Sequence, residues 1–279
     1  MSPNLSAPTP AVAVTRPEEE EAGEDRLSQL LRREGIRPLS FPLMALASPI
    51  SMGALNAAVR RLVEALQRGE APPYTWIVIT SRNVILPFLE AVRRAGGSPE
   101  SLQDAGLHVA AVGQATATAL ESVGLPPDLV PTRYNAEDLL GALRERGAIG
   151  YGSRILLPRA EVARDVLPEG VRDLGGSVDV VTAYRVVEDR AGAEALCQAV
   201  RQEMIQGVTL TSGRAARLLG ATWAAVGGGA WPRTVRVGVI GPVTAEAARK
   251  AGLRVDEISE EATLPALARA MARTLGVSE

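Results

Sequence analysis

The stretch LHVAAVGQATATALESVGL, residues 107–125, recurs in altered form as VRVGVIGPVTAEAARKAGL, residues 235–253. The two copies align without a gap at an offset of 128 positions, which places Gly113 on Gly241. Each copy has the pattern of a short apolar strand, a glycine turn and a helix. A repeat spaced by about half the chain is too long for a solenoid and indicates two similar domains.

Further segment pairs follow the same duplication. WIVITSRN resembles GVTLTSGR, YNAEDLLGAL resembles EATLPALARA, and AVAVTRPEEE resembles RILLPRAEVA. Their aligned polar residues are Thr80 and Thr211, Ser81 and Ser212, Asn135 and Thr263, and Arg16 and Arg159. Two similar domains imply a cleft between them, and clefts at domain interfaces commonly bind ligands.

Length and composition exclude several classes of protein. The 279 residues suffice for two buried cores, and no apolar run approaches the roughly 18–20 residues that a membrane span needs. A net charge of −2 and the lack of an arginine-rich stripe argue against nucleic-acid binding. Residues 1–10, MSPNLSAPTP, lack the basic and apolar regions of a signal peptide. We therefore expect a disordered tail there, and a cytoplasmic, monomeric protein.

Scarce residue types restrict the chemistry that the chain can perform. His108 is the only histidine and begins an expected strand, where a structural role is the simpler interpretation. Cys197 is the only cysteine, which excludes an internal disulfide, and its helical surroundings predict a buried, inert thiol. Lys250 is the only lysine and belongs to no P-loop or Schiff-base motif. These scarcities exclude a P-loop and a Schiff-base lysine, and any histidine-based site would have to use His108.

Short apolar runs alternate with helical patterns along the chain. We expect strands at residues 11–14, 36–43, 76–80, 108–113, 153–158, 178–188, 208–212 and 235–241, with helices between them, among them 51–66, 83–97 and 161–176. This alternation predicts an α/β fold of two similar domains with parallel sheets flanked by helices. The segment WAAVGGGAWP, residues 223–232, lacks the context of a dinucleotide fingerprint, so we expect a flexible loop.

A hydroxyl or amide residue stands at the start of many expected helices. The expected helix caps are Ser81, Thr116, Asn135, Ser212, Thr244 and Thr263. A single residue of this kind indicates no more than a cap. In a parallel sheet, however, these loops all lie at the carboxyl ends of the strands, and helix N-termini attract anions. Together with Arg16 and Arg159, the set predicts a site for a polyanionic small molecule.

An ordered set of motifs from about residue 11 to residue 273 resembles the uroporphyrinogen-III synthase family. The motifs are VTRPEE, VITSRN, AAVGQATATALESVGLPPDLVP, YNAEDLLGAL, ILLPRAEVARDVLPEGVRDLGGSVDVVTAYRVV, VTLTSGRAA and VIGPVTAEAARKAGL. No single motif is specific, but their order is. The resemblance implies a cofactor-free and metal-free enzyme that cyclises the linear tetrapyrrole hydroxymethylbilane to uroporphyrinogen III. Water is lost and the terminal pyrrole ring is inverted, and the polycarboxylate substrate suits a polyanion site.

The same resemblance implies a chain that crosses between domains and returns. Domain one would comprise residues 11–40 and 188–279, and domain two would comprise residues 48–179. Residues 41–47 and 180–187 would form a two-stranded hinge. The repeat alone would instead divide the chain near its middle, so these boundaries rest on the resemblance.

Site residues also follow from the resemblance. Tyr184 would act as the acid that protonates the departing hydroxyl, since a phenol with an ordinary pKa of about 10 is protonated at neutral pH. A strand tyrosine with a purely structural role is the open alternative. Thr244 would hydrogen-bond a carboxylate or the hydroxyl. The expected substrate-binding residues are Arg16, Thr80, Ser81, Asn83, Gly113, Gln114, Ala115, Thr116, Asn135, Arg159, Thr211, Ser212, Gly213, Arg214, Gly241, Pro242 and Val243.

The chain departs from the family pattern at two places, and other functions stay open. Ser212-Gly213-Arg214 stands where Ser-Pro-Ser is common, and Asn83-Val84 where Asn-Gly is common. Arg214 is either a carboxylate clamp or a surface residue. The first alternative function is a non-catalytic, two-lobed binding module for a polyanionic small molecule. The second is an enzyme that acts on a phosphorylated metabolite, because helix N-termini do not distinguish phosphate from carboxylate.

Overall fold

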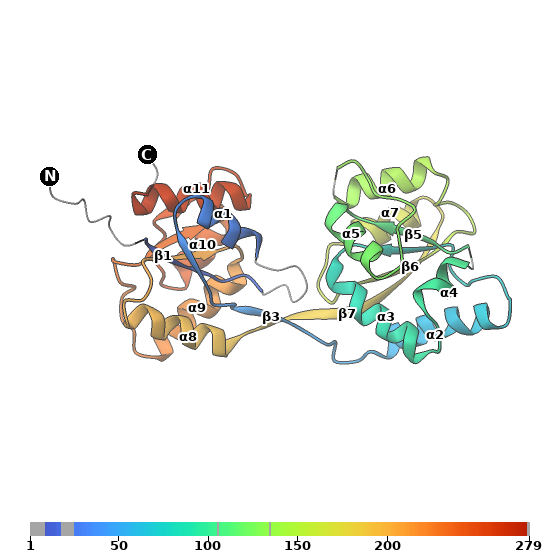
Figure 1. The fold of residues 1–279 in the computed structure, drawn as a ribbon, viewed down its shortest axis with the longest axis horizontal. Helices are drawn as coiled ribbons and strands as arrows, with labels where there is room; N and C mark the ends of the chain where they lie inside the picture. Colours follow the sequence, from blue (N-terminus) through green and yellow to red (C-terminus); the bar gives the residue numbers. More distant parts are fainter. Residues whose placement is uncertain (1–8, 18–24, 105, 134, 278–279) are drawn as a thin grey trace. The chain divides into compact units, whose positions relative to one another are not determined.

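The computed structural model describes residues 9–17, 25–104, 106–133 and 135–277. The chain divides into two compact units, one within Met1–Ala45 and Val187–Glu279 and the other within Leu46–Val186 (Figure 1). The expected disordered tail lies outside the described residues, apart from its last two positions. The predicted domain boundaries and the cleft stay predictions, because compactness alone does not show which parts fold independently.

The first unit contains one five-stranded sheet and its helices. Its elements are β1 (Ala11–Val14), α1 (Arg26–Arg33), β2 (Arg37–Ser40), α8 (Arg190–Arg201), β8 (Gly207–Leu210), α9 (Gly213–Ala225), β9 (Arg236–Val239), α10 (Pro242–Lys250), β10 (Glu257–Ile258) and α11 (Leu264–Leu275). The strand order is β10-β9-β8-β1-β2, and every neighbouring pair is parallel.

Both faces of this sheet are buried. On β1, Val12 and Val14 pack with α1 and α11, whereas Ala11 and Ala13 face the cluster formed by α8, α9 and α10. A strand covered on both sides requires a continuous apolar run, which explains why AVAV carries no polar residue. The unit is therefore a three-layer α/β/α sandwich.

The second unit repeats this architecture. Its elements are α2 (Gly53–Gln67), β4 (Trp76–Ile79), the 3₁₀ helix η1 (Arg82–Val84), α3 (Ile85–Arg94), α4 (Pro99–Asp104), β5 (His108–Ala111), α5 (Gln114–Ser122), α6 (Ala136–Glu145), β6 (Arg154–Ala160), α7 (Val166–Asp173) and β7 (Ser177–Glu188). The strand order is β3-β7-β6-β4-β5, in which β3 (Met44–Ala47) belongs to the segment that links the units. β4, β5, β6 and β7 pair in parallel.

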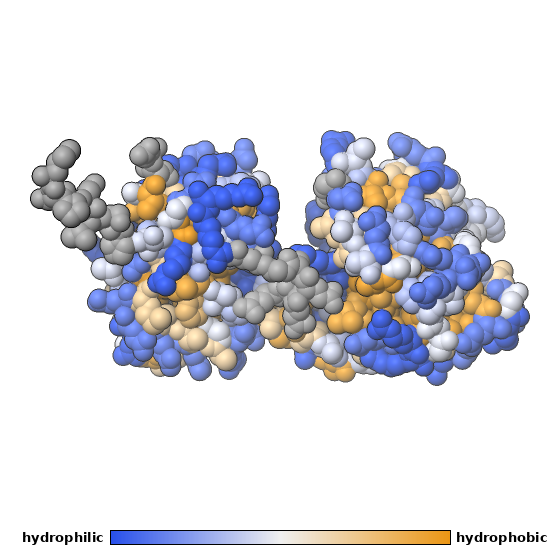
Figure 2. All heavy atoms as spheres, in the orientation of Figure 1, coloured by the Kyte–Doolittle hydropathy of each residue, from blue (hydrophilic) through white to orange (hydrophobic). Residues whose placement is uncertain are grey.

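Alternate residues of β4 again face opposite layers. Ile77 and Ile79 belong to the cluster with α2, α3, α4 and α5, whereas Trp76 and Val78 belong to the cluster with α6 and α7. The expected α/β fold with two similar, helix-flanked parallel sheets is confirmed. In Figure 2, hydrophilic and hydrophobic residues are interspersed over the visible face of each unit. No helix of the described ranges has both the length and the apolar character needed to cross a membrane.

The two sheets share one strand arrangement, but the chain enters it at different points. Sheet position matches β4 with β8, β5 with β9, β6 with β1 and β7 with β2. In the second unit, an isolated parallel bridge between Ala110 of β5 and Leu129 stands where β9 pairs with β10 in the first unit. The second unit is therefore a circular permutation of the first.

Strand register supports this equivalence at the level of single residues. Val12 lies opposite Gly207 in the first unit, and Ile155 lies opposite Trp76 in the second. Counting along the strands from these pairs makes Arg16 equivalent to Arg159. The sequence repeat thus aligns residues that occupy the same place in the two sheets.

Two expectations about secondary structure were wrong. The helix expected over 161–176 begins only at Val166, and residues 161–165 form a loop. The loop expected over 223–232 begins only after α9 ends at Ala225, and its flexibility stays a prediction. Trp223 and Trp231 pack edge to face at 5.1 Å between ring centroids, and their indole N–H groups donate to the carbonyl oxygens of Gly229 and Val235.

Candidate functional site

The loops after β4 and β6 diverge from neighbouring strands of the second unit. The loop after β4 leads to η1 and α3 on one face of the sheet, and the loop after β6 leads to α7 on the other. In an open parallel sheet, such divergence creates a crevice at the carboxyl ends of the strands, where ligands bind. A cavity of about 300 Å³ lies at this point.

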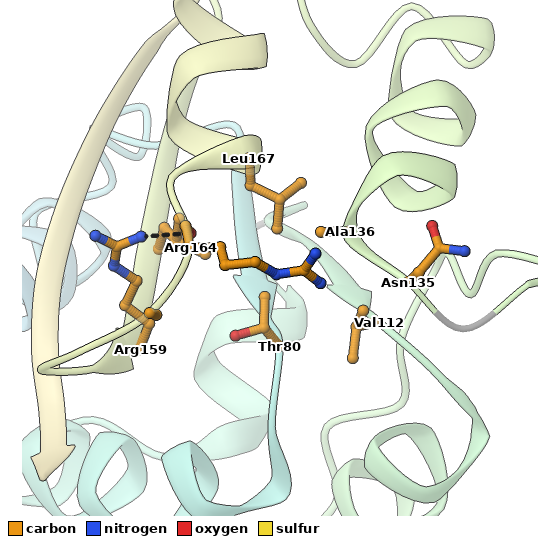
Figure 3. A pocket seen from close by; sticks show the side chains of 9 residues that line it. Thr80, Val112, Asn135, Ala136, Arg159, Arg164 and Leu167 are labelled. Atoms are coloured by element: carbon orange, nitrogen blue, oxygen red, sulfur yellow. Dashed lines mark hydrogen bonds between the residues drawn. The ribbon is translucent and has the colours of Figure 1, made fainter. Parts of the chain in front are cut away.

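Three of the predicted site residues line this cavity together (Figure 3). Thr80 follows β4, Arg159 stands near the end of β6, and Asn135 begins α6. The other lining residues, which the sequence analysis did not single out, are Val112, Ala136, Leu157, Ala163, Arg164 and Leu167. Among the described residues, the lining thus combines apolar side chains with two arginines and contains no acid.

The two arginines of the cavity are held in different ways. Arg159 donates from Nη1 to the carbonyl oxygen of Arg164 at 3.0 Å and from Nη2 to Oδ1 of Asp165 at 2.7 Å. The side chain of Arg164 extends into the centre of the view in Figure 3, above Thr80 and toward Ala136. Its Nη1 lies 3.6 Å from Oε1 of Glu137, which is an ion pair too long for a hydrogen bond. This contact therefore holds the Arg164 side chain only weakly.

Asn135 caps α6 as expected. Its Oδ1 accepts from the backbone N–H of Asp138 at 2.7 Å, and its Nδ2 donates to Oδ2 of Asp138 at the same distance. Arg133 also pairs with Asp138 at 3.2 Å. These contacts fix the start of α6 beside the cavity.

The first unit carries an equivalent arginine. Nε of Arg16 donates to Oδ1 of Asp25 at 3.0 Å, and Asp25 also caps α1 by accepting from the backbone N–H groups of Leu27 and Ser28. Arg16 and Arg159 thus both bind the N-cap aspartate of the next helix, Asp25 or Asp165.

Hydroxyl groups connect the strands at the corresponding divergence point of the first unit. The hydroxyl of Thr15 donates to the carbonyl oxygen of Thr209 at 2.7 Å, and that of Thr209 donates to the carbonyl oxygen of Ala13 at 3.0 Å. Ser212 caps α9 through the N–H of Ala215 at 3.1 Å. The carboxyl ends of β1 and β8 are therefore fixed relative to each other.

Side-chain capping was predicted correctly for four helices and wrongly for two. Ser81, Asn135, Ser212 and Thr263 accept hydrogen bonds at the starts of η1, α6, α9 and α11. Thr116 and Thr244 do not cap, because the N-caps of α5 and α10 are Gly113 and Gly241. Both threonine side chains lie inside the first helical turn, and both residues are only 6% exposed.

Tyr184 lies on β7 beside the loop that carries Arg164. Its ring packs, partly buried, against the core cluster of the second unit, and its carbonyl oxygen accepts from the N–H of Glu161 at 2.9 Å. The pairing of β6 with β7 shifts register between Arg159 and Ala160, and Ala160 lies opposite Tyr184. A bulge of this kind re-aims side chains at the edge of a sheet. Tyr184 does not line the described cavity.

The remaining predicted residues stand at helix starts of their own units. In the second unit they are Asn83 in η1 and Gln114 and Ala115 in α5. In the first unit they are Thr211 before the cap of α9, Gly213 and Arg214 in α9, and Pro242 and Val243 in α10. Arg214 lies 3.8 Å from Glu188, and Val243 is 80% exposed.

The scarce residues have structural positions. His108 begins β5 and stacks on Trp76 at 4.8 Å between ring centroids. Burial and, to a smaller extent, Glu194 raise the pKa of the Cys197 thiol to about 11. Within the described part of the chain, no three His, Cys, Asp or Glu side chains gather closely enough to hold a metal ion.

The structure thus defines a class of protein with a duplicated α/β fold and, in its second unit, a cavity at the strand ends that two arginines line. A family model described as uroporphyrinogen-III synthase HemD matches residues 25–269. The chain therefore belongs to the uroporphyrinogen-III synthase family, as its motifs indicated.

Two relatives agree with this assignment. A protein of Methanothermobacter thermautotrophicus is 32% identical over 203 residues, which cover 72% of this chain and 73% of the relative. A protein of Synechococcus elongatus named uroporphyrinogen-III synthase is 26% identical over 247 residues, which cover 85% of this chain and 86% of its own.

Solved structures show a similar fold. A mutant uroporphyrinogen III synthase from Thermus thermophilus matches with a TM-score of 0.52 and 20% identity over 97% of this chain and 100% of its own. Uroporphyrinogen-III synthetase from Helicobacter pylori matches with a TM-score of 0.53 and 14% identity over 96% of this chain and 99% of its own.

Proposed function

We propose that this chain converts hydroxymethylbilane to uroporphyrinogen III in haem biosynthesis, with loss of water and inversion of the terminal pyrrole ring. The observation that carries the proposal is the family match, which spans both units. The enzyme is a lyase, and its chemistry is performed by side chains and backbone groups of this chain without a cofactor.

The cavity of the second unit binds substrate carboxylates. Arg159 and Arg164 supply positive charge, and Thr80 and Asn135 supply hydrogen-bonding groups at a point where helix α6 begins. The equivalent edge of the first unit, with Arg16 and the N-terminus of α9, receives further carboxylates. A substrate with many carboxylates needs such positions repeated, and the duplication of the fold provides them.

Ring closure begins with departure of the substrate's hydroxyl group as water. Tyr184 donates the proton, and the remaining electrophilic azafulvene is attacked by the substituted carbon of the terminal pyrrole. The resulting spiro intermediate fragments and closes again with that ring inverted. The proton released when the newly bonded pyrrole becomes aromatic again returns to the phenolate of Tyr184. Thr244 donates a hydrogen bond to a carboxylate or to the departing hydroxyl.

The isomer formed by the purified protein tests this function. Hydroxymethylbilane closes spontaneously to the type I isomer, so formation of the type III isomer in excess, in the presence of a chelator, requires the enzyme. We expect that excess, and recovery of the type I isomer alone, as in a protein-free control, would refute the proposal. The alternative, a non-catalytic module that binds a polyanion, predicts binding of the tetrapyrrole without any change in isomer ratio.

The proposal includes the compartment, the oligomeric state and the partners of the enzyme. The enzyme acts as a cytoplasmic monomer on a diffusing small molecule and has no nucleic-acid partner. Sedimentation of the purified chain at several concentrations tests the monomer.

A further inference from the structure

In the loop between β6 and α7, the N-cap aspartate of α7 binds an arginine side chain and not the backbone of its helix. Asp165 is the N-cap of α7, but its side chain makes no hydrogen bond to the backbone of the helix. An aspartate at this position normally accepts from the second or third N–H of the helix and stabilises it by about 1 kcal/mol. Here one carboxylate oxygen of Asp165 instead accepts a hydrogen bond from Nη2 of Arg159 at 2.7 Å.

Arg159 is bound at two points of the loop. Besides Asp165, it binds the carbonyl oxygen of Arg164 at 3.0 Å, and its side chain is only 16% exposed. These two bonds fix the backbone immediately before α7, and Figure 3 shows the one to Arg164. The side chain of Arg164, by contrast, is 77% exposed, and its one contact with a described residue is the long ion pair with Glu137.

The first unit shows that this pairing belongs to the fold. Arg16 is the register equivalent of Arg159, and it binds Asp25, the N-cap aspartate of its own next helix. In the first unit Asp25 binds the arginine and also caps its helix. In the second unit Asp165 binds the arginine but makes no capping hydrogen bond. The second unit thus loses a cap and keeps the arginine contact, which points to a role for the contact other than helix stability.

We propose that Arg159 and Asp165 are positioning residues that hold Arg164 in the cavity, where Arg164 binds a substrate carboxylate. The inference rests on the proposed function and deepens it. A guanidinium offers two parallel N–H donors to a carboxylate. The ion pair of Arg164 with Glu137 is exposed and 3.6 Å long, so it is weaker than such a two-point contact with the substrate. Glu137 releases Arg164 when the substrate carboxylate arrives.

Removal of the Arg164 charge is the first test. Arg164→Gln should raise the KM for hydroxymethylbilane and the Kd for uroporphyrin III by about 10- to 100-fold, the range for loss of a hydrogen bond to a charged group. The loss should appear in KM more than in turnover, because a carboxylate contact that is equally strong in the bound substrate and in the transition state contributes uniform binding. Arg172→Gln is the matched control, since it removes the same charge from an exposed position at the other end of α7.

A double-mutant cycle tests the positioning role. Asp165→Asn keeps the shape and a good N-cap residue, and it should raise the same KM and Kd by several-fold with an unchanged melting temperature. If Asp165 acts through Arg164, the double variant should be no worse than Arg164→Gln alone. Additive effects, or a loss of turnover and melting temperature in Asp165→Asn, would show a merely structural role.

The outcome separates this inference from the proposed function. If the unmodified chain forms no type III isomer, the proposed function is wrong whatever the variants do. If the unmodified chain forms it and Arg164→Gln behaves like Arg172→Gln, the proposed function stands and the role of Arg164 is overturned.

Discussion

The phenol of Tyr74 donates a hydrogen bond to Oδ2 of Asp179 at 2.7 Å, at the amino-terminal edge of the second sheet. Arg61 of α2 and Arg154 of β6 each reach the same carboxylate oxygen at 3.1 Å. Tyr74 is fully buried, so this cluster joins a helix, two strands and the core at the edge opposite the cavity.

The first prediction concerns the stability of this cluster. Burial raises the pKa of Asp179, but the hydrogen bonds and charges of Tyr74, Arg154 and Arg61 outweigh burial and hold that pKa below its ordinary value. A lowered carboxyl pKa stabilises the fold above the unfolded pKa, about 3.9, and the stabilisation disappears as pH falls through the folded pKa. Asp179→Asn should therefore cost about 1–3 kcal/mol at pH 7 and less near pH 3.

Urea unfolding at several pH values measures this difference. Asp104→Asn, at an exposed position of α4, serves as the control and should change the free energy of unfolding little at any pH. A cost for Asp179→Asn that is the same at pH 3 and pH 7 would contradict the assigned charge interactions.

The second prediction concerns the thiol of Cys197. The residue is 1% exposed, and its pKa of about 11 leaves little thiolate at pH 8. Alkylation should therefore be at least about a hundredfold slower in the native protein than in urea, on the thiolate fraction alone. Because Cys197 is the only cysteine, mass spectrometry of the intact chain reports its rate directly. Native labelling at a rate near that of the unfolded chain would mean that α8 opens readily.

The third prediction separates two roles of glycine at the ends of α10. Gly241 has φ 176°, which any residue adopts, and an added Cβ would come no closer than 3.8 Å to Ala262. The fold therefore tolerates alanine there. If a substrate carboxylate approaches the first N–H groups of α10, Gly241→Ala should raise the product Kd by about tenfold or more and leave the melting temperature unchanged.

Gly252 provides the opposite case. Its φ of +80° lies in the left-handed region, so Gly252→Ala should lower stability by about 1 kcal/mol without changing product affinity. An unchanged Kd for Gly241→Ala would remove this backbone segment from the proposed site.

Most strands of the two sheets could be predicted from the sequence, because strands buried on both faces must be apolar throughout. AVAV and WIVI leave little alternative to a buried strand, and the register of their repeats placed Arg16 and Arg159 at equivalent positions. β10 escaped notice because a two-residue strand, Glu257–Ile258, has no recognisable period. α4 was missed for a similar reason, since six residues span less than two helical turns.

The parts of the site that could not be predicted depend on tertiary contacts. Residues 161–165 have a helical composition, but Pro168 is tolerated only in the first turn of a helix, and Arg159 binds the Arg164 carbonyl and Asp165 just before α7 begins at Val166. Arg164 lines the cavity from this loop, and no local motif singles it out. The caps at Thr116 and Thr244 were misplaced because each helix begins before its threonine, directly after a glycine.

The last prediction tests Tyr184 as the acid of the reaction. Tyr184→Phe removes the proton donor and keeps the ring that packs against the core of the second unit. Loss of a general acid costs about 10²- to 10⁴-fold in rate, so turnover should fall by that range while product affinity and melting temperature change little. The bond from Glu161 to the Tyr184 carbonyl persists in this variant, because it belongs to the backbone.

Tyr184→Ala separates catalysis from packing. Truncation of a partly buried ring should lower the stability by up to about 3 kcal/mol, since cavity formation adds to the lost apolar burial. If the ring serves only to fill the core, the Phe variant should keep near-normal turnover, and only the Ala variant should lose stability. Turnover to the type III isomer and the melting temperature, measured for both variants, decide between the two roles, and full activity of Tyr184→Phe would exclude the phenol from the mechanism.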